Sequence, residues 1–275
     1  MSASHQYPSE TATVAVAYDR PRQRERAEAL AMRLNLPTAQ RLADPHDLHL
    51  TVASRPKLCD RLELRVNDYL HRKPPLGGGN PVAAEPHLLD VTSPAGRKLN
   101  APLFKAVGIR KGNLHRPHVL DATAGFGEDA WLLAAAGCTV TAYERNPIIH
   151  ALLEDALRRA ADTQPETASR ITLHHANLLV PGTRLTNHPP EVIYLDPMFP
   201  LGRKTTEKKP MRLLRWIIGN DDDATALAAI AMKHATRRVV EKLPPHVART
   251  VAYAPTYIHG DKAVRYHMYA IPNAI

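Results

Sequence analysis

The stretch HVLDATAGFGEDAWLLAAAG, residues 118–137, begins with an apolar run and continues into a turn that contains Gly125 and Gly127. The run ends at Asp121, and an alanine-rich apolar segment follows the turn as far as Gly137. Glycine adopts the positive φ angles that tight turns need, and it commonly follows the last residue of a helix. The stretch therefore predicts a short buried strand, a tight turn and a helix.

The same alternation continues towards the C-terminus. Apolar residues at helical spacing follow Asn146 and Pro147, and another helix is expected near residues 223–236. Further strands are expected at TVTAYE (139–144), ITLHH (171–175), VIYLD (192–196), RRVVEKL (237–243), YAPTYIH (253–259) and VRYHMYAI (264–271). Strands that alternate with helices predict an α/β fold with a doubly wound, largely parallel, Rossmann-like sheet. The last two strands are expected to form an antiparallel edge.

The first part of the chain has a different pattern. The elements expected there are a helix at residues 21–34 and strands at residues 13–18, 48–52 and 62–66. We therefore predict a small N-terminal α+β region with a Gly/Pro-rich linker, residues 1–100, and a Rossmann-like domain, residues 101–275. The linker includes HRKPPLGGGNP (71–81). Its three glycines fit either a flexible connection or a loop whose backbone approaches a ligand.

Basic residues outnumber acidic ones, with 36 Lys and Arg against 27 Asp and Glu and a formal net charge of +9. A basic surface attracts polyanions, so nucleic acid is a natural partner, although many basic proteins bind none. No stretch approaches the roughly 18 continuous apolar residues of a membrane helix, and the first residues lack a signal-peptide pattern. Cys59 and Cys138 form no CxxC pair and are expected to be small core residues in a reducing compartment. The composition predicts a cytoplasmic protein without a membrane partner.

The glycine turn is the expected site of a nucleotide-type cofactor, because ligands of a parallel α/β sheet bind beyond the carboxyl ends of its strands. Glu144 ends the next strand, where a carboxylate can accept hydrogen bonds from both ribose hydroxyls. GFGEDA (125–130) matches G-x-G-x-x-G/A, so an NAD-dependent oxidoreductase is one interpretation. Read from Asp121, the same residues match the D-x-x-x-G-x-G pattern of S-adenosylmethionine enzymes. Glu128 and Asp129 at the helix start would repel a pyrophosphate and suit the cationic groups of S-adenosylmethionine.

A second motif follows the strand VIYL. Asp196, Pro197, Met198 and Phe199 have the form of the [N/D]-P-P-[Y/F] loop of enzymes that methylate exocyclic amines of bases. The lone pair of such an amine is delocalised into the ring, so a carboxylate that accepts its N–H groups favours a nucleophilic geometry. An aromatic ring can stack on the base, and proline stiffens the loop. We expect these four residues to be catalytic; the alternative is that Asp-Pro merely ends a strand and Phe199 joins the core.

The segment LGRKTTEKKPMRLLRW, residues 201–216, is strongly basic and follows this loop directly. Phosphate contacts position a nucleic acid without reading its sequence, so we expect the segment to bind RNA; a solvated basic loop is the alternative. The candidate RNA-binding residues are His71, Arg72, Lys73, Arg203, Lys204, Lys208, Lys209 and Arg212. No HExxH or CxxC pattern is present, and DDD at 221–223 suits a helix N-terminus better than a Mg²⁺ site, so no metal is expected.

Several motifs together resemble one family. VLDATAGFGEDAW, YERNPII, YLDPMFP and LFKAVGIRKG are similar to the bacterial ribosomal RNA small subunit methyltransferase J family, with a likeness from about residue 71 onwards. The resemblance implies a seven-stranded class I domain that uses S-adenosylmethionine to make N2-methylguanosine in 16S rRNA of the small ribosomal subunit. It places cofactor contacts on Glu128, Asp129, Glu144, Arg145, Asn177, Leu178 and Asp196, in addition to Asp121, Gly125 and Gly127 of the glycine turn.

Three features depart from the family pattern. Glu128 stands where a basic residue is familiar, ANLL (176–179) replaces a more Ser-rich turn, and residues 81–97 are extra sequence. None of them touches the LDPMFP loop. Two other functions stay open: an NAD-dependent oxidoreductase, and a non-catalytic RNA-binding protein with a degenerate cofactor pocket. The sequence defines neither the oligomeric state nor whether naked rRNA or an assembled subunit is the substrate.

Overall fold

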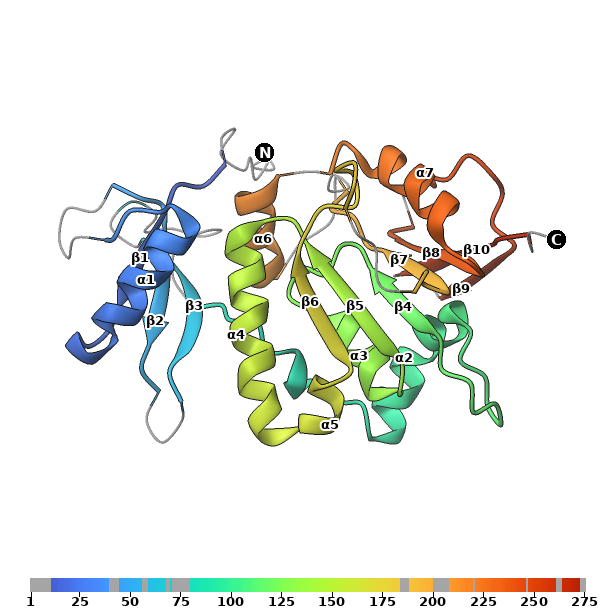
Figure 1. Cartoon of the computed structure of the whole chain (residues 1–275), viewed down its shortest axis with the longest axis horizontal. Coiled ribbons are helices and arrows are strands. Elements are labelled where there is room, and N and C mark those ends of the chain that lie inside the picture. Colours follow the sequence, from blue (N-terminus) through green and yellow to red (C-terminus); the bar gives the residue numbers. More distant parts are fainter. Residues whose placement is uncertain are drawn as a thin grey trace, which may run out of the picture. The chain divides into compact units, whose positions relative to one another are not determined.

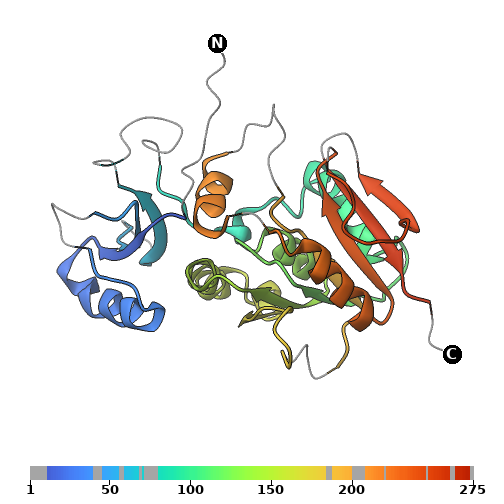
Figure 2. The same cartoon turned by 90° about the horizontal axis from the view of Figure 1, so that it is seen from above.

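The computed structural model describes residues 11–39, 45–55, 59–67, 70, 80–183, 188–199, 208–219, 221–245, 247–260 and 264–272 (Figures 1 and 2). The chain forms two compact units, which are described separately. Unit 1 comprises Met1–Ala84, Asn146–Arg159 and Arg203–Asn220, and unit 2 comprises Glu85–Arg145, Ala160–Gly202 and Asp221–Ile275. The boundary at residue 100 that the sequence suggests stays a prediction.

Unit 2 is built on a seven-stranded sheet with the strand order β6-β5-β4-β7-β8-β10-β9 (Figure 1). The strands are β4 (His118–Asp121), β5 (Thr139–Glu144), β6 (Ile171–His175), β7 (Val192–Leu195), β8 (Arg238–Leu243), β9 (Tyr257–Gly260) and β10 (Arg265–Ala270). Strands β4 to β8 pair in parallel, and β10 runs antiparallel to both β8 and β9. This topology confirms the Rossmann-like α/β prediction, including its antiparallel edge.

The helices of unit 2 cover both faces of this sheet. They are the 3₁₀ helix η2 (Pro86–Leu88) and the α-helices α2 (Pro94–Val107), α3 (Glu128–Ala135), α5 (Pro165–Ala168) and α7 (Ala224–His234). Helix α7 packs against β7 and β8, and α2 packs on β8, β9 and β10 from the opposite face (Figure 2). Leu227, Ala228 and Ala231 of α7 meet Leu120, Ile193 and Val239 of the sheet in a buried apolar cluster. Such burial fixes the strand ends that form the site.

Helix α2 was not anticipated, because it crosses the predicted boundary at residue 100 and contains Pro94 and Pro102, which local pattern assigns to loops. Ser93 caps the helix by accepting a hydrogen bond from the amide of Gly96, and Pro94 lies in the first turn, where a missing N–H is harmless. Pro102 lies inside the helix. The burial of Leu103 and Val107 outweighs this unfavourable proline.

Unit 1 contains a three-stranded sheet of β1 (Val14–Tyr18), β2 (Leu48–Ala53) and β3 (Arg61–Val66) in the order β1-β2-β3. Strands β2 and β3 are antiparallel, as the alternating sequence predicted, and β1 joins β2 in parallel. The helices are η1 (Pro21–Gln23), α1 (Arg24–Leu34), α6 (Lys209–Ile218) and most of α4 (Pro147–Thr163), whose last four residues belong to unit 2.

A buried carboxylate joins α4 to the rest of unit 1. Asp155 accepts hydrogen bonds from the amide of Leu62 on β3 at 2.9 Å, from Arg26 on α1 at 2.7 Å and from Arg159 at 2.9 Å. Arg159 also donates to the carbonyl of Ala84 at 2.7 Å. The charged pair of Asp155 and Arg159 is therefore compensated by hydrogen bonds on both sides, which a buried ion pair requires.

The two cysteines differ in environment. Cys138 is buried, as predicted, whereas Cys59 is exposed, so the prediction of a core position for Cys59 was wrong. Cys59 lies directly before β3, at a point where the chain is at the surface. Within the described residues, no helix is both long and apolar enough to span a membrane.

Candidate active site

Three acidic residues meet at the carboxyl edge of the unit 2 sheet. Asp121 is the last residue of β4, Glu144 is the last residue of β5, and Asp196 directly follows β7. Because β4 pairs in parallel with β5 on one side and β7 on the other, the ends of these strands lie side by side. The sequence predicted this arrangement from the positions of the acids at strand ends.

The glycine turn between β4 and α3 is anchored by Glu144. Gly125 and Gly127 have φ angles of 53° and 78°, in the left-handed region that favours glycine. The amide of Gly125 donates to Oε2 of Glu144 at 2.9 Å, and the amide of Ala124 donates to the carbonyl of Tyr143 at 2.9 Å. The turn is therefore attached to the end of the neighbouring strand.

A lysine that the sequence did not suggest lies at the centre of the site. Nζ of Lys242, on β8, is 2.7 Å from Oδ2 of Asp129 and 2.9 Å from Oδ2 of Asp196. The hydroxyl of Tyr194 on β7 also donates to Oδ2 of Asp129, at 2.6 Å. One polar network thus joins the first turn of α3 to the ends of β7 and β8. The only feature of the sequence that could have indicated this network is Lys242 itself, a lysine near the end of an otherwise mostly apolar strand.

This network shifts the protonation of its members. Burial lowers the pKa of Lys242, but the carboxylates of Asp129 and Asp196 outweigh it and raise that pKa well above its ordinary value. Burial raises the pKa of Asp196, and the positive charge of Lys242 opposes this rise. Burial, assisted by Asp129 and Asp196, raises the pKa of Asp121 to about 8. Asp121 is therefore mainly protonated at neutral pH, whereas Lys242 favours an ionised Asp196.

Thr123 connects the glycine turn to the loop after β7. Its amide donates to Oδ1 of Asp121 at 3.1 Å, and its hydroxyl accepts a hydrogen bond from the amide of Asp196 at 2.7 Å. The backbone at Asp196 is thereby fixed to the turn that follows β4. In the loop itself, Pro197 and Met198 are buried and Phe199 is half-buried.

Asp221 holds the same loop from the other side. Its Oδ2 accepts a hydrogen bond from the amide of Met198 at 2.5 Å, and its amide donates to the carbonyl of Met198 at 3.0 Å. Arg145, directly after β5, pairs with Asp221 and with Asp223, the latter at 2.6 Å. Asp223 does occupy the N-cap position of α7, but its side chain makes no capping hydrogen bond. Asp221 therefore holds the loop, and Asp221 and Asp223 together hold Arg145, while neither side chain is shown to cap the helix.

The remaining candidate residues take no part in the polar network around Lys242. Glu128 is exposed at the start of α3. Oδ1 of Asn177 accepts a hydrogen bond from the amide of Leu179 at 2.9 Å, and Leu178 is buried in the apolar cluster beneath α7. Lys208 is exposed, and Lys209 and Arg212 are half-buried at the start of α6 in unit 1. The other RNA-binding candidates lie outside the described residues: His71, Arg72, Lys73, Arg203 and Lys204.

The donor set fits a cationic nucleoside better than a dinucleotide. Carboxylates at the ends of β5 and β7 and in the first turn of α3 surround the glycine turn, and Lys242 offsets part of their charge. Asp121, at the end of β4, is mainly protonated and adds a neutral polar group. A pyrophosphate would meet Glu128 and Asp129 at the start of α3, where unopposed amides are needed. A sulfonium and an ammonium group are stabilised by the same acids. Among the described residues, no group of three or more His, Cys, Asp or Glu side chains could hold a metal ion.

Comparison with known proteins agrees with this chemistry. Residues 90–271 match the family model "Putative SAM-dependent methyltransferase", where SAM is S-adenosylmethionine. The chain is 27% identical to the crystal structure of the SAM-dependent methyltransferase NGO1261 from Neisseria gonorrhoeae, with a TM-score of 0.67 over 96% of this chain and 98% of that one. The cofactor is therefore S-adenosylmethionine, and the NAD-dependent alternative is wrong.

Two relatives carry the name ribosomal RNA small subunit methyltransferase J. The protein from Yersinia enterocolitica is 41% identical over 214 residues, which cover 76% of this chain and 82% of the relative. The protein from Pseudomonas fluorescens is 47% identical over 171 residues, which cover 61% of this chain and 65% of the relative. On this evidence, and with the matching fold and strand-end acids, the chain belongs to the ribosomal RNA small subunit methyltransferase J family, and it is a SAM-dependent methyltransferase.

Proposed function

We propose that this protein transfers the methyl group of S-adenosylmethionine to the exocyclic N2 of a guanine in 16S rRNA of the small ribosomal subunit, in the cytoplasm. The rRNA substrate is supported by the name of the relatives that align with most of the chain. The amine acceptor is supported by one structural observation. Asp196 lies at the end of β7, bound through its amide to Thr123 and through its carboxylate to Lys242.

In this proposal Asp196 binds the amine that is methylated. An ionised carboxylate accepts the N–H groups of the guanine amine and turns its lone pair towards the methyl donor. Lys242 keeps Asp196 ionised, and Thr123 and Asp221 keep the loop in place. Pro197 stiffens that loop. Phe199, half-buried, stacks on the base, a contact worth about 1–3 kcal/mol per base.

When bound, S-adenosylmethionine supplies a methyl group that its positively charged sulfur makes electrophilic. We propose that the residues around the glycine turn hold this cofactor, with Glu144 as the partner of the ribose. The set is Asp121, Gly125, Gly127, Glu128, Asp129, Glu144, Arg145, Asn177, Leu178 and Asp196. Alignment of donor and acceptor can supply roughly 7–11 kcal/mol of the barrier, so no strong base is needed. As the amine nitrogen forms its bond to the methyl group, the sulfur keeps the electron pair of the broken S–C bond, and Asp196 receives the proton that the amine loses.

The basic candidates are proposed to hold the RNA backbone rather than to read its sequence. Lys208, Lys209 and Arg212 form a short basic run at the start of α6. A base that is paired or stacked must leave its stack to reach Asp196, at a cost of a few kcal/mol. A target that is already presented by folded rRNA would lower this cost.

The test is methyl transfer from tritiated S-adenosylmethionine to naked 16S rRNA and to small subunits, both from cells that lack this protein. We expect label in N2-methylguanosine with the wild type. Asp196→Ala should lower kcat at saturating cofactor by about 10²–10³-fold, the scale of removing one oriented polar group. Cofactor affinity, measured by calorimetry, should fall much less, because the other residues of the cofactor set remain. Asp162→Ala, an exposed acid near the end of α4, is the matched control and should retain full activity.

Two results would contradict the proposal. Label on another atom of the RNA would exclude guanine N2 as the acceptor. Full activity of Asp196→Ala would exclude the role of this carboxylate. The preparation that accepts more label identifies whether the enzyme acts on naked rRNA or on the assembled particle.

A further inference from the structure

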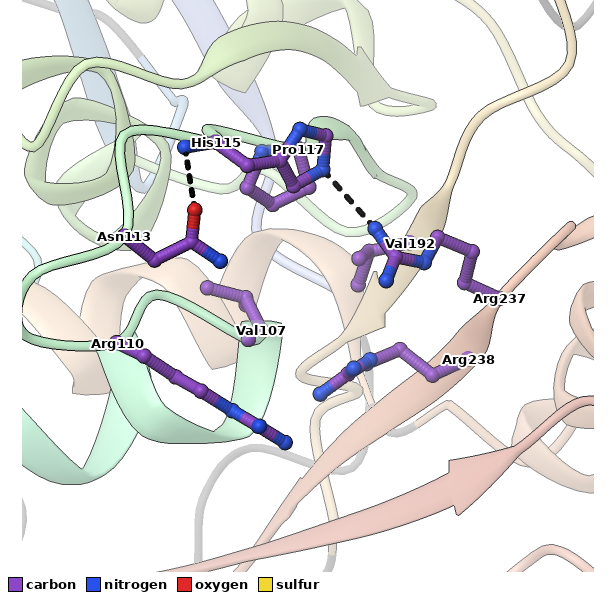
Figure 3. Close-up of a pocket in the computed structure, with 9 residues that line it drawn as sticks. Val107, Arg110, Asn113, His115, Pro117, Val192, Arg237 and Arg238 are labelled. Atoms are coloured by element: carbon purple, nitrogen blue, oxygen red, sulfur yellow. Dashed lines mark hydrogen bonds between the residues drawn. The ribbon is translucent and has the colours of Figure 1, made fainter.

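A cavity lies in unit 2 at the edge of the sheet opposite the strand-end acids, where β7 and β8 begin (Figure 3). Its volume is about 120 Å³. The polar residues that line it are Arg110, Asn113, His115, Arg237 and Arg238, and Val192 of β7 forms part of the apolar wall. Strand β7 runs from Val192 to Leu195, so roughly 13 Å of strand separates this cavity from Asp196. The cavity is therefore distinct from the methyl-transfer site.

Three guanidinium groups approach this cavity, and no carboxylate lines it among the described residues. Figure 3 shows the side chains of Arg110 and Arg238 pointing toward one another below Val107. Glu191, which directly precedes Val192, is already bound: it accepts hydrogen bonds from Arg237 at 2.9 Å and from the amide of His118 at 3.2 Å. The positive charge of the cavity is thus only partly offset.

The environment of Arg238 shows the effect of several positive charges lying close together. Arg238 donates to the carbonyl of Ala106 at 3.3 Å, near the C-terminus of α2. Gly108 leaves room for it, because a Cβ atom there would lie 3.0 Å from Cζ of Arg238. Burial, and then the like charges of Arg237 and Arg110, lower the pKa of Arg238. An anion in the cavity would relieve this repulsion.

Arg110 is the residue best placed to bind such an anion. It follows α2, is exposed at the rim, and makes no ion pair within the part of the chain that the structure describes. The amide of His115 donates to Oδ1 of Asn113 at 2.8 Å, which fixes the loop between Arg110 and β4. The rim of the cavity therefore presents a guanidinium group that meets no acidic partner among the described residues.

We propose that this cavity binds a phosphate group, either as free phosphate or as a phosphodiester of an RNA backbone. Its volume of about 120 Å³ is several times the roughly 10–15 Å³ that a cavity needs to hold one water molecule, which leaves space for a tetrahedral anion. The planar guanidinium group donates two parallel hydrogen bonds to phosphate oxygens. Two or more such groups match the charge of a phosphate better than that of a carboxylate.

The first experiment titrates inorganic phosphate into the purified full chain by calorimetry, at constant ionic strength. We expect the wild type to bind phosphate and Arg110→Gln to bind it at least tenfold more weakly. Lys111→Gln is the matched control, because it removes the same charge from the next residue, which does not line the cavity. It should bind phosphate as the wild type does. This experiment requires no methyl transfer, so its result is independent of the proposed function.

The second experiment measures binding of naked 16S rRNA by filter retention over a range of salt concentrations. If the cavity holds an RNA phosphate, Arg110→Gln weakens binding several-fold and lowers the slope of log K against log salt by about 1, more than Lys111→Gln does. If only the binding of inorganic phosphate responds to Arg110→Gln, the ligand is free phosphate. The proposal is overturned if Arg110→Gln and Lys111→Gln behave alike in both experiments.

Discussion

Lys242 controls how readily Asp196 takes up a proton, because its ammonium group lies 2.9 Å from one oxygen of that carboxylate. Burial alone favours the protonated acid, which donates a hydrogen bond and cannot accept two N–H groups equally well. In the proposed reaction the lysine is thus a positioning residue. It acts through Asp196 and Asp129 rather than on the base itself.

Replacement of Lys242 by Met should shift the acidic limb of the kcat–pH profile to higher pH. The pKa of Asp196 rises in this variant, because burial remains while the opposing positive charge is removed. The measurement is kcat as a function of pH with saturating cofactor and RNA. Lys233→Met, an exposed lysine on α7, is the control and should leave the profile unchanged. An acidic limb at the same pH in Lys242→Met and the wild type would exclude this role.

Asp121 should make the free energy of unfolding depend on pH. Its folded pKa of about 8 lies above its ordinary value of 3.8. Below that ordinary value the group is protonated in both states, and its contribution is fully present. Between about pH 4 and 8 the unfolded chain ionises while the folded chain keeps its proton, so stability falls by at most about 1.4 kcal/mol per pH unit.

The measurement is urea unfolding of the wild type and Asp121→Asn at several pH values. The variant keeps the oxygen that accepts the amide of Thr123 but has no proton to lose. We expect the wild type to lose stability relative to Asp121→Asn as the pH rises from 4 to 8. A difference that stays constant over this range would show that Asp121 ionises normally.

For single residues, the sequence predicted the positions of those that lie at strand ends, such as Glu144 and Asp196, because strand ends follow from local pattern. Lys242 could not be found in the same way. It is 113 residues from Asp129 in the chain, and only the pairing of β7 with β8 brings it to the site. Local periodicity describes which face a residue occupies, but not which distant charge it meets.

At the scale of elements, the loop after β7 is held by the segment that directly precedes α7. Asp221 binds the amide and the carbonyl of Met198 and also pairs with Arg145. This arrangement fixes both sides of the proposed base-binding loop. A shift of about 1 Å at a reacting group can reduce a rate by about 10²-fold, so contacts of this kind matter for activity even without touching the substrate.

Asp221→Ala should lower kcat by about 10- to 100-fold with little effect on cofactor affinity, because the loop loses its acceptor while the glycine turn is unchanged. Steady-state kinetics and calorimetry give the two quantities. Asp222→Ala is the adjacent control, since this exposed acid can be removed without a change at Met198. Equal kcat values for the two variants would mean that Asp221 does not hold the loop.

The elements themselves were largely predictable, because apolar alternation and helical spacing are local signals. Strands β1 to β10 all lie within or beside expected segments. Two of the longer helices are exceptions: α6, which begins within the basic segment 201–216 for which no helix was expected, and α2. The two prolines of α2 indicate a loop, and the decisive contribution comes from contacts with β8, β9 and β10, which lie far away in the sequence. Tertiary packing therefore overrides local preference at this position.

At the scale of the whole molecule, unit 1 is stabilised by helix α4, which lies far after strands β1 to β3 in the sequence. Asp155 and Arg159 of α4 are both buried and contact β3, α1 and the carbonyl of Ala84. Removal of one partner of a buried ion pair leaves an uncompensated charge, which costs about 3–5 kcal/mol. These contacts could not be predicted from the sequence, since they join distant residues; Leu62 and Asp155, for example, are 93 residues apart.

Asp155→Asn should lower the free energy of unfolding by about 3–5 kcal/mol, as measured by urea denaturation. Glu154→Gln is the control. Glu154 is the neighbouring acid, pairs with Arg33 at 2.7 Å, and is about half exposed. Loss of such a surface pair changes stability by about 1 kcal/mol or less. Similar losses in the two variants would show that burial gives Asp155 no special role.

The composition of unit 1 from three separate segments affects how the protein is made. On a translating ribosome the β1–β2–β3 sheet emerges first, but the helix that supplies Asp155 follows 93 residues after Leu62. At about 5–20 residues per second, this delay is roughly 5–20 s. The nascent sheet waits through that interval without the helix that carries Asp155, so a chain that stalls there leaves an incomplete fragment for chaperones and proteases to remove.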